Sequence, residues 1–167
     1  MAARDSAHLC LRKPILEIWI DADACPNPVK EVIFRAALRT GVKVWLVANK
    51  GIKLPKQPNV FLLIAPKTPD AADFMIVEKL KEGDLVVTAD VPLAAQVVEK
   101  NSFALNPRGE FYNRETIHEK LATRNLMQSL RDSGTIQGGG PPSYTDREKQ
   151  SFANALDRFL AKQVNLG

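Results

Sequence analysis

The sequence predicts an α/β protein with a three-layer α/β/α arrangement around a mostly parallel sheet of five strands. The first supporting observation is a series of five short apolar runs, which is typical of buried strands. The second is that segments with the 3.6-residue period of a helix separate most of these runs. Such alternation favours a parallel sheet with helices on both faces. The predicted strands are Ile15–Ile20, Val42–Ala48, Val60–Ile64, Leu85–Val87 and Ser102–Leu105.

Three helices are predicted between these strands. Residues 29–36 place apolar side chains at i, i+3, i+4 and i+7, directly after the first strand. A shorter pattern over 74–80 follows the third strand, and a third pattern over 93–98 follows the fourth. The link over 49–59 lacks a helical pattern and contains a glycine and two prolines, so we predict an exposed loop there.

The C-terminal third of the chain has a different character. Residues 115–130 are polar with a weak helical stripe, and 133–143 are rich in glycine and proline, as in a linker. Thr145 followed by Glu148 is a capping-box pattern, which predicts a last helix whose apolar face packs on the core. We therefore divide the chain into an N-terminal extension (1–13), an α/β domain (14–131), a Gly/Pro-rich linker (132–144) and a C-terminal amphipathic helix (145–167).

The composition excludes several classes of protein. The chain has 167 residues, of which 45% are hydrophobic and 25% charged, as in a globular protein. No apolar run approaches the roughly 20 residues of a membrane span, and the first residues lack a secretory signal. The two cysteines, Cys10 and Cys25, exclude a disulfide framework. We expect a soluble cytoplasmic protein without a membrane partner, whose net charge of +4 suits a polyanion. The sequence leaves a homodimer open.

Acidic side chains gather at the predicted carboxyl ends of three strands. In a parallel sheet these ends share one edge, where ligands bind. Clustered carboxylates repel one another unless a hard divalent cation such as Mg²⁺ or Mn²⁺ binds them. The residues are Asp21 and Asp23 after the first strand, Asp70 and Asp73 after the third, and Thr88 and Asp90 after the fourth.

We predict that this edge carries metal-dependent hydrolysis of a phosphate ester, because a bound cation activates water and neutralises phosphoryl charge. Thr88 is predicted to orient a carboxylate or a water molecule. The predicted metal ligands and catalytic acids, for one or two Mg²⁺ or Mn²⁺ ions, are Asp21, Asp23, Asp73 and Asp90.

Helix capping is the competing interpretation for each aspartate taken singly. Asp70 follows Pro69 and Asp90 precedes Pro92, and both positions are typical of a helix start. Asp73 fits a cap less well, because it falls within the first turn or two of its helix. Asp84 precedes the fourth strand at the opposite edge, and we predict that it is a turn residue.

Basic and amide side chains are predicted at the same edge as the acids. Lys50 and Lys53 lie in the loop after the second strand, and Arg108 follows the fifth. We predict that they contact the phosphates of a nucleic-acid backbone, and that Asn49 orients the substrate. A solvated surface is the competing explanation for each lysine, and a simple turn is the competing explanation for Asn49.

Cys25 lies at a predicted helix N-terminus, where the helix dipole favours a thiolate. Neither histidine is adjacent in the sequence, and His118 lies in a polar helix. We therefore interpret Cys25 as a small buried residue rather than a nucleophile.

Four motifs in order resemble the YaiI/YqxD family of bacterial proteins. They are Asp-Ala-Asp-Ala-Cys-Pro (21–26), Asp-Ala-Ala-Asp (70–73), Gly-Asp-Leu-Val-Val-Thr-Ala-Asp-Val-Pro-Leu-Ala (83–94) and Asn-Pro-Arg-Gly (106–109). The resemblance covers about residues 15 to 160. The fold class of this family is similar to the PIN-like nuclease domains, in which acids at strand ends bind Mg²⁺ or Mn²⁺ and cleave RNA.

This resemblance implies roles for individual residues. Asp21 matches the acid that closes the first PIN-like strand, and Asp90, preceded by Thr88, matches the acid after the fourth. Asp73 stands roughly where those domains place a helix acid, which is often Glu. Asp23 and Cys25 have no general counterpart there. We expect the strand order 3-2-1-4-5, in which Asp21 and Asp90 flank the topological switch point.

The function predicted from the sequence is metal-dependent hydrolysis of phosphodiester bonds, with RNA as the substrate. One alternative is a phosphatase with Asp21 as nucleophile and Asp23 as acid and base, since Asp-x-Asp after a buried strand also suits aspartyl-phosphate chemistry. The other alternative is an RNA- or protein-binding module that keeps the acidic pocket without turnover.

Overall fold

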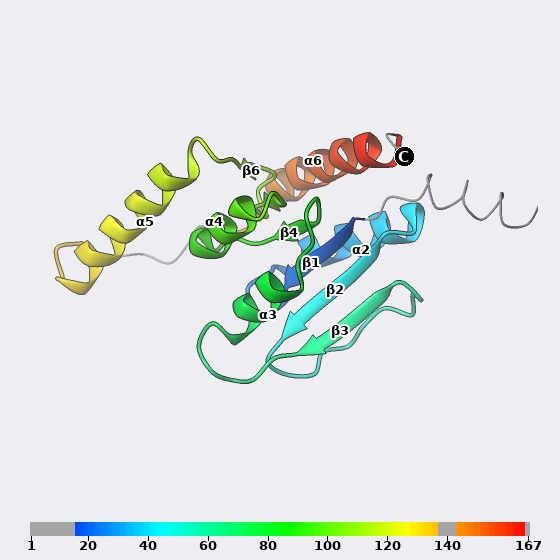
Figure 1. Cartoon of the computed structure of the whole chain (residues 1–167), viewed down its shortest axis with the longest axis horizontal. Helices are drawn as coiled ribbons and strands as arrows, with labels where there is room; N and C mark the ends of the chain where they lie inside the picture. Colours follow the sequence, from blue (N-terminus) through cyan, green and yellow to red (C-terminus); the bar gives the residue numbers. More distant parts are fainter. Residues whose placement is uncertain (1–15, 137–142, 166–167) are drawn as a thin grey trace, which may run out of the picture.

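The computed structural model describes residues 16–136 and 143–165 of the chain. The predicted extension at 1–13, with Cys10, and the middle of the predicted linker, residues 137–142, lie outside the described residues. The strands (Figure 1) are β1 (Glu17–Asp21), β2 (Lys43–Ala48), β3 (Val60–Ile64), β4 (Leu85–Val87), β5 (Phe103–Leu105) and β6 (Phe111–Tyr112). The helices are α2 (Asn27–Thr40), α3 (Ala71–Lys79), α4 (Val91–Glu99), α5 (Ile117–Asp132) and α6 (Asp146–Asn165).

The strands form one sheet in the order β3-β2-β1-β4-β5-β6. Neighbours from β3 to β5 are parallel, which confirms the predicted order 3-2-1-4-5. The apolar pattern does not predict β6, which pairs antiparallel with β5 and is too short to show a period. The order reverses between β1 and β4, so the carboxyl ends of these two strands form the switch point at which α/β proteins bind ligands.

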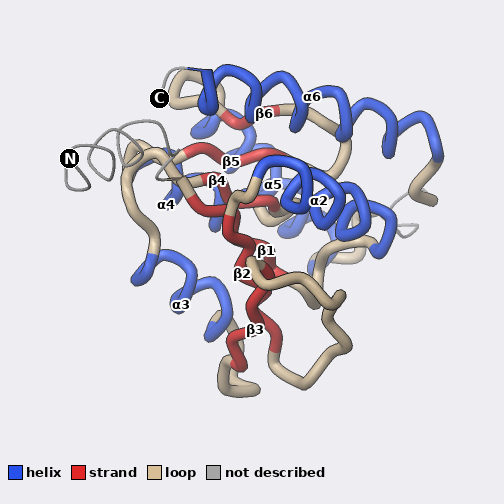
Figure 2. Tube along the Cα trace, turned by 90° about the vertical axis from the view of Figure 1, so that its right-hand side faces the viewer, coloured by secondary structure: helices blue, strands red, loops and turns tan. Residues whose placement is uncertain are grey.

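Helices cover both faces of the sheet, which gives the predicted three layers. Figure 2 shows α2 on one side of the strands and α3 on the other. The first face is covered by α2 and α6, and the second by α3 and α4 together with the start of α5. Fully buried side chains on the first face include Ile18, Ile20, Ile33, Leu46, Phe152 and Leu156. Those on the second face include Ile76, Val86, Leu93 and Ala104.

Three aromatic rings pack across the second face. Trp19, Trp45 and Phe61 occupy matching register positions on β1, β2 and β3. The ring centroids of the two tryptophans are 5.6 Å apart, and those of Trp45 and Phe61 are 4.6 Å apart. Cross-strand aromatic pairs of this kind stabilise a sheet, so they support the pairing of β1, β2 and β3.

The helix boundaries follow local signals in the sequence. α2 has a proline in its first turn and is capped at its end by Gly41, whose N–H donates to the carbonyl of Ala37 at 2.8 Å and whose φ of 78° turns the chain out of the helix. The predicted capping box of α6 is confirmed. Thr145 and Glu148 exchange backbone-to-side-chain hydrogen bonds, each 3.4 Å long.

α6 packs against the core beside the β5–β6 hairpin. The ring of Phe159 lies 5.0 Å from that of Phe103 and 5.6 Å from that of Phe111, measured between centroids. At Gly109, which has a φ of 93°, a Cβ atom would stand 2.6 Å from the carbonyl oxygen of Ser151. Glycine is therefore required where the hairpin meets this helix.

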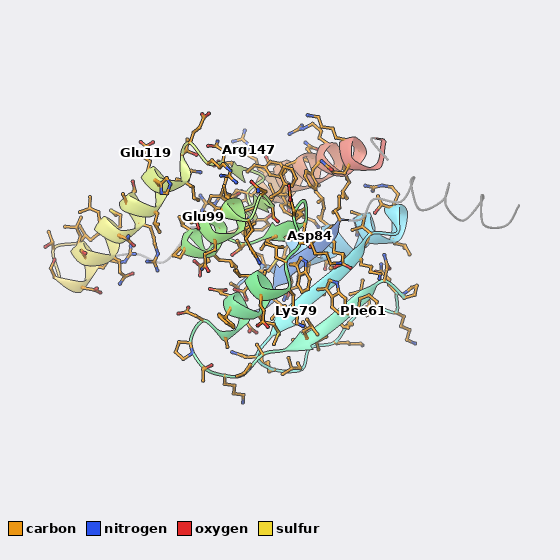
Figure 3. The ribbon with its side chains drawn as sticks, viewed as in Figure 1. Phe61, Lys79, Asp84, Glu99, Glu119 and Arg147 are labelled. Atoms are coloured by element: carbon orange, nitrogen blue, oxygen red, sulfur yellow. The ribbon has the colours of Figure 1, made fainter. Side chains whose placement is uncertain are left out.

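Asp84 has a larger role than the predicted turn. Its backbone N–H does close a turn on the carbonyl of Lys81 at 3.0 Å. Its side chain, however, is 1% exposed and lies inside the molecule where β4 begins (Figure 3). One carboxylate oxygen accepts the N–H of Glu17 at 2.9 Å, and the other accepts the indole N–H of Trp19 at 3.1 Å and the N–H of Lys81 at 3.0 Å. This buried carboxylate ties β1 to β4 at the edge opposite the acidic cluster.

α5 extends beyond the other elements at one end of the molecule (Figure 1). Two of its apolar side chains, Leu126 and Met127, are 59% and 40% exposed. Among the helices of the described ranges, none is both long enough and apolar enough to cross a membrane.

Candidate functional site

The end of β1 is tied to the end of β2. Asp21 is the last residue of β1, and the next N–H, from Ala22, donates to the carbonyl of Val47 at 2.9 Å. Asp23 is exposed in the following loop, and its carboxylate accepts the backbone N–H of Asn49 at 3.0 Å. This contact places Asn49 beside the two aspartates.

The loop after β4 positions Asp90. Thr88 is buried, and its hydroxyl oxygen accepts the N–H of Asp90 at 3.0 Å. The Asp90 carboxylate accepts the N–H of Leu93 at 3.2 Å, so its predicted role as a helix cap is confirmed for α4. Because a carboxylate has two oxygens, capping with one is compatible with ligand binding by the other.

α3 contributes two more acids. Asp70 occupies the N-cap position with a φ of 62°, a left-handed conformation that is uncommon outside glycine. Its side chain makes no capping hydrogen bond, so helix capping does not account for this residue. Asp73 lies one turn later, in the first turn of α3.

These acids share one pocket of about 370 Å³ at the carboxyl edge of the sheet. The four predicted metal ligands all line it, together with Asn49, Asp70 and Lys67. Thr88 does not line the pocket. Its hydroxyl oxygen contacts the pocket indirectly, by accepting the backbone N–H of Asp90. The full lining is Asp21, Asp23, Asn49, Pro66, Lys67, Thr68, Pro69, Asp70, Ala71, Ala72, Asp73 and Asp90.

The carboxylates perturb one another's ionisation. Burial raises the pKa of Asp73 to about 7, and the charges of Asp90, Asp21 and Asp70 add to the effect. A hydrogen bond between the Asp73 and Asp90 side chains also favours the protonated form of Asp73. Burial, followed by the charges of Asp23 and Asp90, raises the pKa of Asp21, against backbone hydrogen bonds that oppose the rise.

No ion pair relieves this repulsion among the residues described. The recorded ion pairs join other residues, and none includes an acid of the pocket. As the side chains stand, no three His, Cys, Asp or Glu residues within 16–136 and 143–165 are arranged to hold a metal ion. Carboxylate oxygens are the donor type that a hard cation prefers, but these side chains would have to move to form a shared ligand shell.

The predicted basic residues are distributed over separate parts of the surface. Lys53 lines a different pocket of about 370 Å³, beside α2. Arg108 lines a cavity of about 480 Å³ next to the acidic pocket. Lys50 is exposed and does not line the acidic pocket. Of the basic side chains, it is Lys67, which follows β3, that lines the acidic pocket.

Cys25 is buried, in agreement with its interpretation as a packing residue. Burial raises the pKa of its thiol to about 12, although the charge of Lys30 opposes the rise. A thiol with this pKa is not a nucleophile at neutral pH. His118 is exposed on α5, whereas Cys25 belongs to the core beneath α2.

The sequence gives no sign of one residue beside the site. Tyr144 lines the cavity next to the acidic pocket and donates a hydrogen bond to the carbonyl of Pro107 at 2.7 Å. It is the last residue of the predicted linker, and nothing in the periodicity of the chain places that segment near the β5–β6 turn.

Known proteins resemble this chain over most of its length. Residues 19–162 match the model of a family described as "Uncharacterized BCR, YaiI/YqxD family". A UPF0178 protein of Syntrophotalea carbinolica is 52% identical over 149 residues, which is 89% of this chain and 100% of that protein. UPF0178 proteins of Thioalkalivibrio sulfidiphilus and Yersinia enterocolitica are each 50% identical over 89% of this chain, and over 100% and 97% of their own lengths. No solved structure matches the chain.

Proposed function

This chain belongs to the YaiI/YqxD family, and from its acidic pocket we propose that it is a metal-dependent nuclease that hydrolyses phosphodiester bonds of RNA. The observation that carries the proposal is the sharing of one pocket by Asp21, Asp23, Asp73 and Asp90, which come from the end of β1, the loops after β1 and β4, and the first turn of α3. Burial and neighbouring carboxylates raise the pKa of Asp21 and Asp73, and acids perturbed in this way cluster at functional sites.

The four aspartates would hold Mg²⁺ or Mn²⁺, because carboxylate oxygens are the ligands these ions prefer. The bound ion would activate water and neutralise charge on the phosphoryl group. Thr88 fixes the backbone of Asp90 and so acts as a positioning residue. Asp73, with a pKa of about 7, is the acid that exchanges a proton near neutral pH and would give it up when a cation binds.

Lys67 supplies a cation to the wall of the acidic pocket, where a substrate phosphate would lie. Arg108 would act from the neighbouring cavity. Lys50 and Lys53 would then contact more distant parts of an RNA chain, because neither lines the acidic pocket. The exposed Asn49, held by Asp23, would contact the sugar or phosphate.

Cleavage of single-stranded RNA in Mn²⁺ tests this proposal. Wild type is compared with Asp21→Asn, and with Asp132→Asn as the matched control, since Asp132 is exposed on α5 outside the pocket. Loss of a residue that only orients a metal ligand typically costs 10–100-fold, so loss of a ligand should cost at least about 100-fold. We expect that loss in Asp21→Asn and none in Asp132→Asn. Equal activity of wild type and Asp21→Asn would count decisively against the site.

Two other outcomes would redirect the assignment. Phosphate release from small monoesters, with a trappable acyl-phosphate on Asp21, would replace the nuclease with an aspartate-nucleophile phosphatase. RNA binding that needs no metal and survives loss of the aspartates would indicate a binding module without turnover.

A further inference from the structure

A second cavity, of about 480 Å³, adjoins the acidic pocket. The two share the loops after β1 and β4, since Ala24 follows Asp23 in the chain and Ala89 precedes Asp90. Its size falls within the range of about 300–1,000 Å³ that is typical of small-molecule sites. The lining residues are Ala24, Pro26, Ala89, Asn106, Pro107, Arg108, Tyr112, Tyr144 and Glu148.

The wall formed by the β5–β6 turn is held by hydrogen bonds. The side-chain oxygen of Asn106 accepts the N–H of Arg108 at 2.9 Å and the N–H of Glu110 at 3.1 Å. The hydroxyl of Tyr144 donates a hydrogen bond to the carbonyl of Pro107, in the same turn, at 2.7 Å. Burial raises the pKa of Tyr144 to about 12, so this hydroxyl keeps its proton and remains a donor at neutral pH. The cavity is therefore built from a fixed turn.

The lining combines apolar surface with one cation, Arg108, and one carboxylate, Glu148. Alanines, prolines and two tyrosines supply the apolar surface, which suits a flat aromatic group. Arg108 is exposed, and none of the ion pairs recorded for the described residues includes it. A guanidinium group binds a phosphate through two parallel hydrogen bonds. An aromatic ring joined to a phosphate is the chemistry of a nucleotide.

A further pocket of about 550 Å³ shares Asn106 and Tyr112 with this cavity, and its lining includes two cations, Lys120 and Arg124, and one carboxylate, Glu119. The ammonium group of Lys120 lies 5.1 Å from the centre of the Tyr112 ring and 3.8 Å from the carboxylate of Glu110. Arg124 joins none of the ion pairs among the described residues, and a cation there suits a polyanionic chain that extends past a bound nucleotide.

We propose that this cavity binds one nucleotide of the RNA substrate, with its base among Tyr112, Tyr144 and the prolines and its phosphate on Arg108. The adjacent phosphodiester is thereby directed toward the acidic pocket. The role of this cavity as an RNA subsite rests on the proposed nuclease function. Its binding of a free nucleotide does not depend on that function.

Titration of the full chain with AMP in EDTA tests the proposal without any metal. Backbone amide NMR locates the site and calorimetry measures the affinity. We expect AMP to shift the amides of Asn106, Arg108 and Tyr112, and to bind at least about tenfold more tightly than ribose 5-phosphate, because stacking of a base contributes to affinity. Arg108→Gln should weaken AMP about tenfold, since it removes a charge-assisted contact. The matched control Arg131→Gln, on the exposed end of α5, should bind as wild type does.

The proposal is overturned by any of three results: no shift at the cavity, equal affinity for AMP in Arg108→Gln and wild type, or equal affinity for AMP and ribose 5-phosphate. Failure of the nuclease function is recognised separately. If AMP binds at the cavity while RNA stays intact in Mn²⁺, the nucleotide site stands and the nuclease falls. If RNA is cleaved while AMP leaves the cavity unshifted, only the subsite falls.

Discussion

Replacement of Asp73 by Asn should stabilise the metal-free protein at alkaline pH. The native pKa of Asp73 is about 7, raised from 3.8, so the folded state holds a proton that the unfolded state releases between these values. Stability is therefore lost as the pH rises from about 4 to about 7. A rise of this size would correspond to about 4 kcal/mol for a fully shielded group. Because Asp73 is only partly buried, solvent screening reduces the cost to about 1–2 kcal/mol.

Urea denaturation in EDTA at several pH values between 4 and 8 measures this cost. We expect Asp73→Asn to exceed wild type by about 1–2 kcal/mol at pH 8, and the difference to shrink as the pH falls and to approach zero near pH 4, where Asp73 is protonated in the folded state and partly protonated in the unfolded state. Mn²⁺ should then stabilise wild type and leave Asp73→Asn little changed, since a cation replaces the proton. The reasoning is refuted if Asp73→Asn is no more stable than wild type at pH 8, or if its advantage does not depend on pH.

Three further predictions concern the framework of the fold. Asp84→Ala should lower the free energy of unfolding by about 3–5 kcal/mol in urea melts, because three N–H donors lose their acceptor. Asp157→Ala, which removes only an exposed ion pair, should cost less than about 1 kcal/mol, and similar losses in both variants would contradict this role. Gly109→Ala should cost at least about 2 kcal/mol, since its Cβ would stand 2.6 Å from the α6 backbone. Gly134→Ala, which also has a positive φ but open space, should cost about 1 kcal/mol, and equal costs would exclude the close approach as the cause. Cys25, with a thiol pKa of about 12, should resist iodoacetamide at pH 8 in peptide mass spectrometry and react after unfolding. Equal rates in the folded and unfolded chain would rule out its burial.

The strands and their parallel arrangement could be predicted because each strand is a short apolar run and the links between most runs carry a helical period, whereas the strand order was expected alongside the resemblance to PIN-like domains. That pattern is set by burial on both faces, which a sequence displays directly. β6 escaped prediction because its two residues are held by pairing with β5, a contact that leaves no periodic trace. The burial of Asp84 could not be predicted for a related reason. It depends on a hydrogen bond from Trp19, which lies 65 residues away in the chain, and local sequence patterns do not show such contacts.

The sequence predicts which aspartates line the acidic pocket better than it predicts which basic residues lie near them. Asp21 and Asp90 are placed by strand ends, and the geometry of a parallel sheet brings strand ends together. Lys53 and Arg108 lie in loops, whose paths depend on tertiary contacts rather than on a local pattern. Arg108, for example, is placed by a turn that Asn106 holds, beside a cavity that is also lined by Tyr144 from the end of the predicted linker.

Anomalous scattering from a crystal soaked in Mn²⁺ tests the central claim most directly. We predict a peak in the acidic pocket, with carboxylate oxygens of Asp21, Asp73 and Asp90 turned toward it from β1, α3 and the loop after β4. Well-ordered aspartates around a pocket without an anomalous peak, at a Mn²⁺ concentration that supports the RNA assay, would contradict the account.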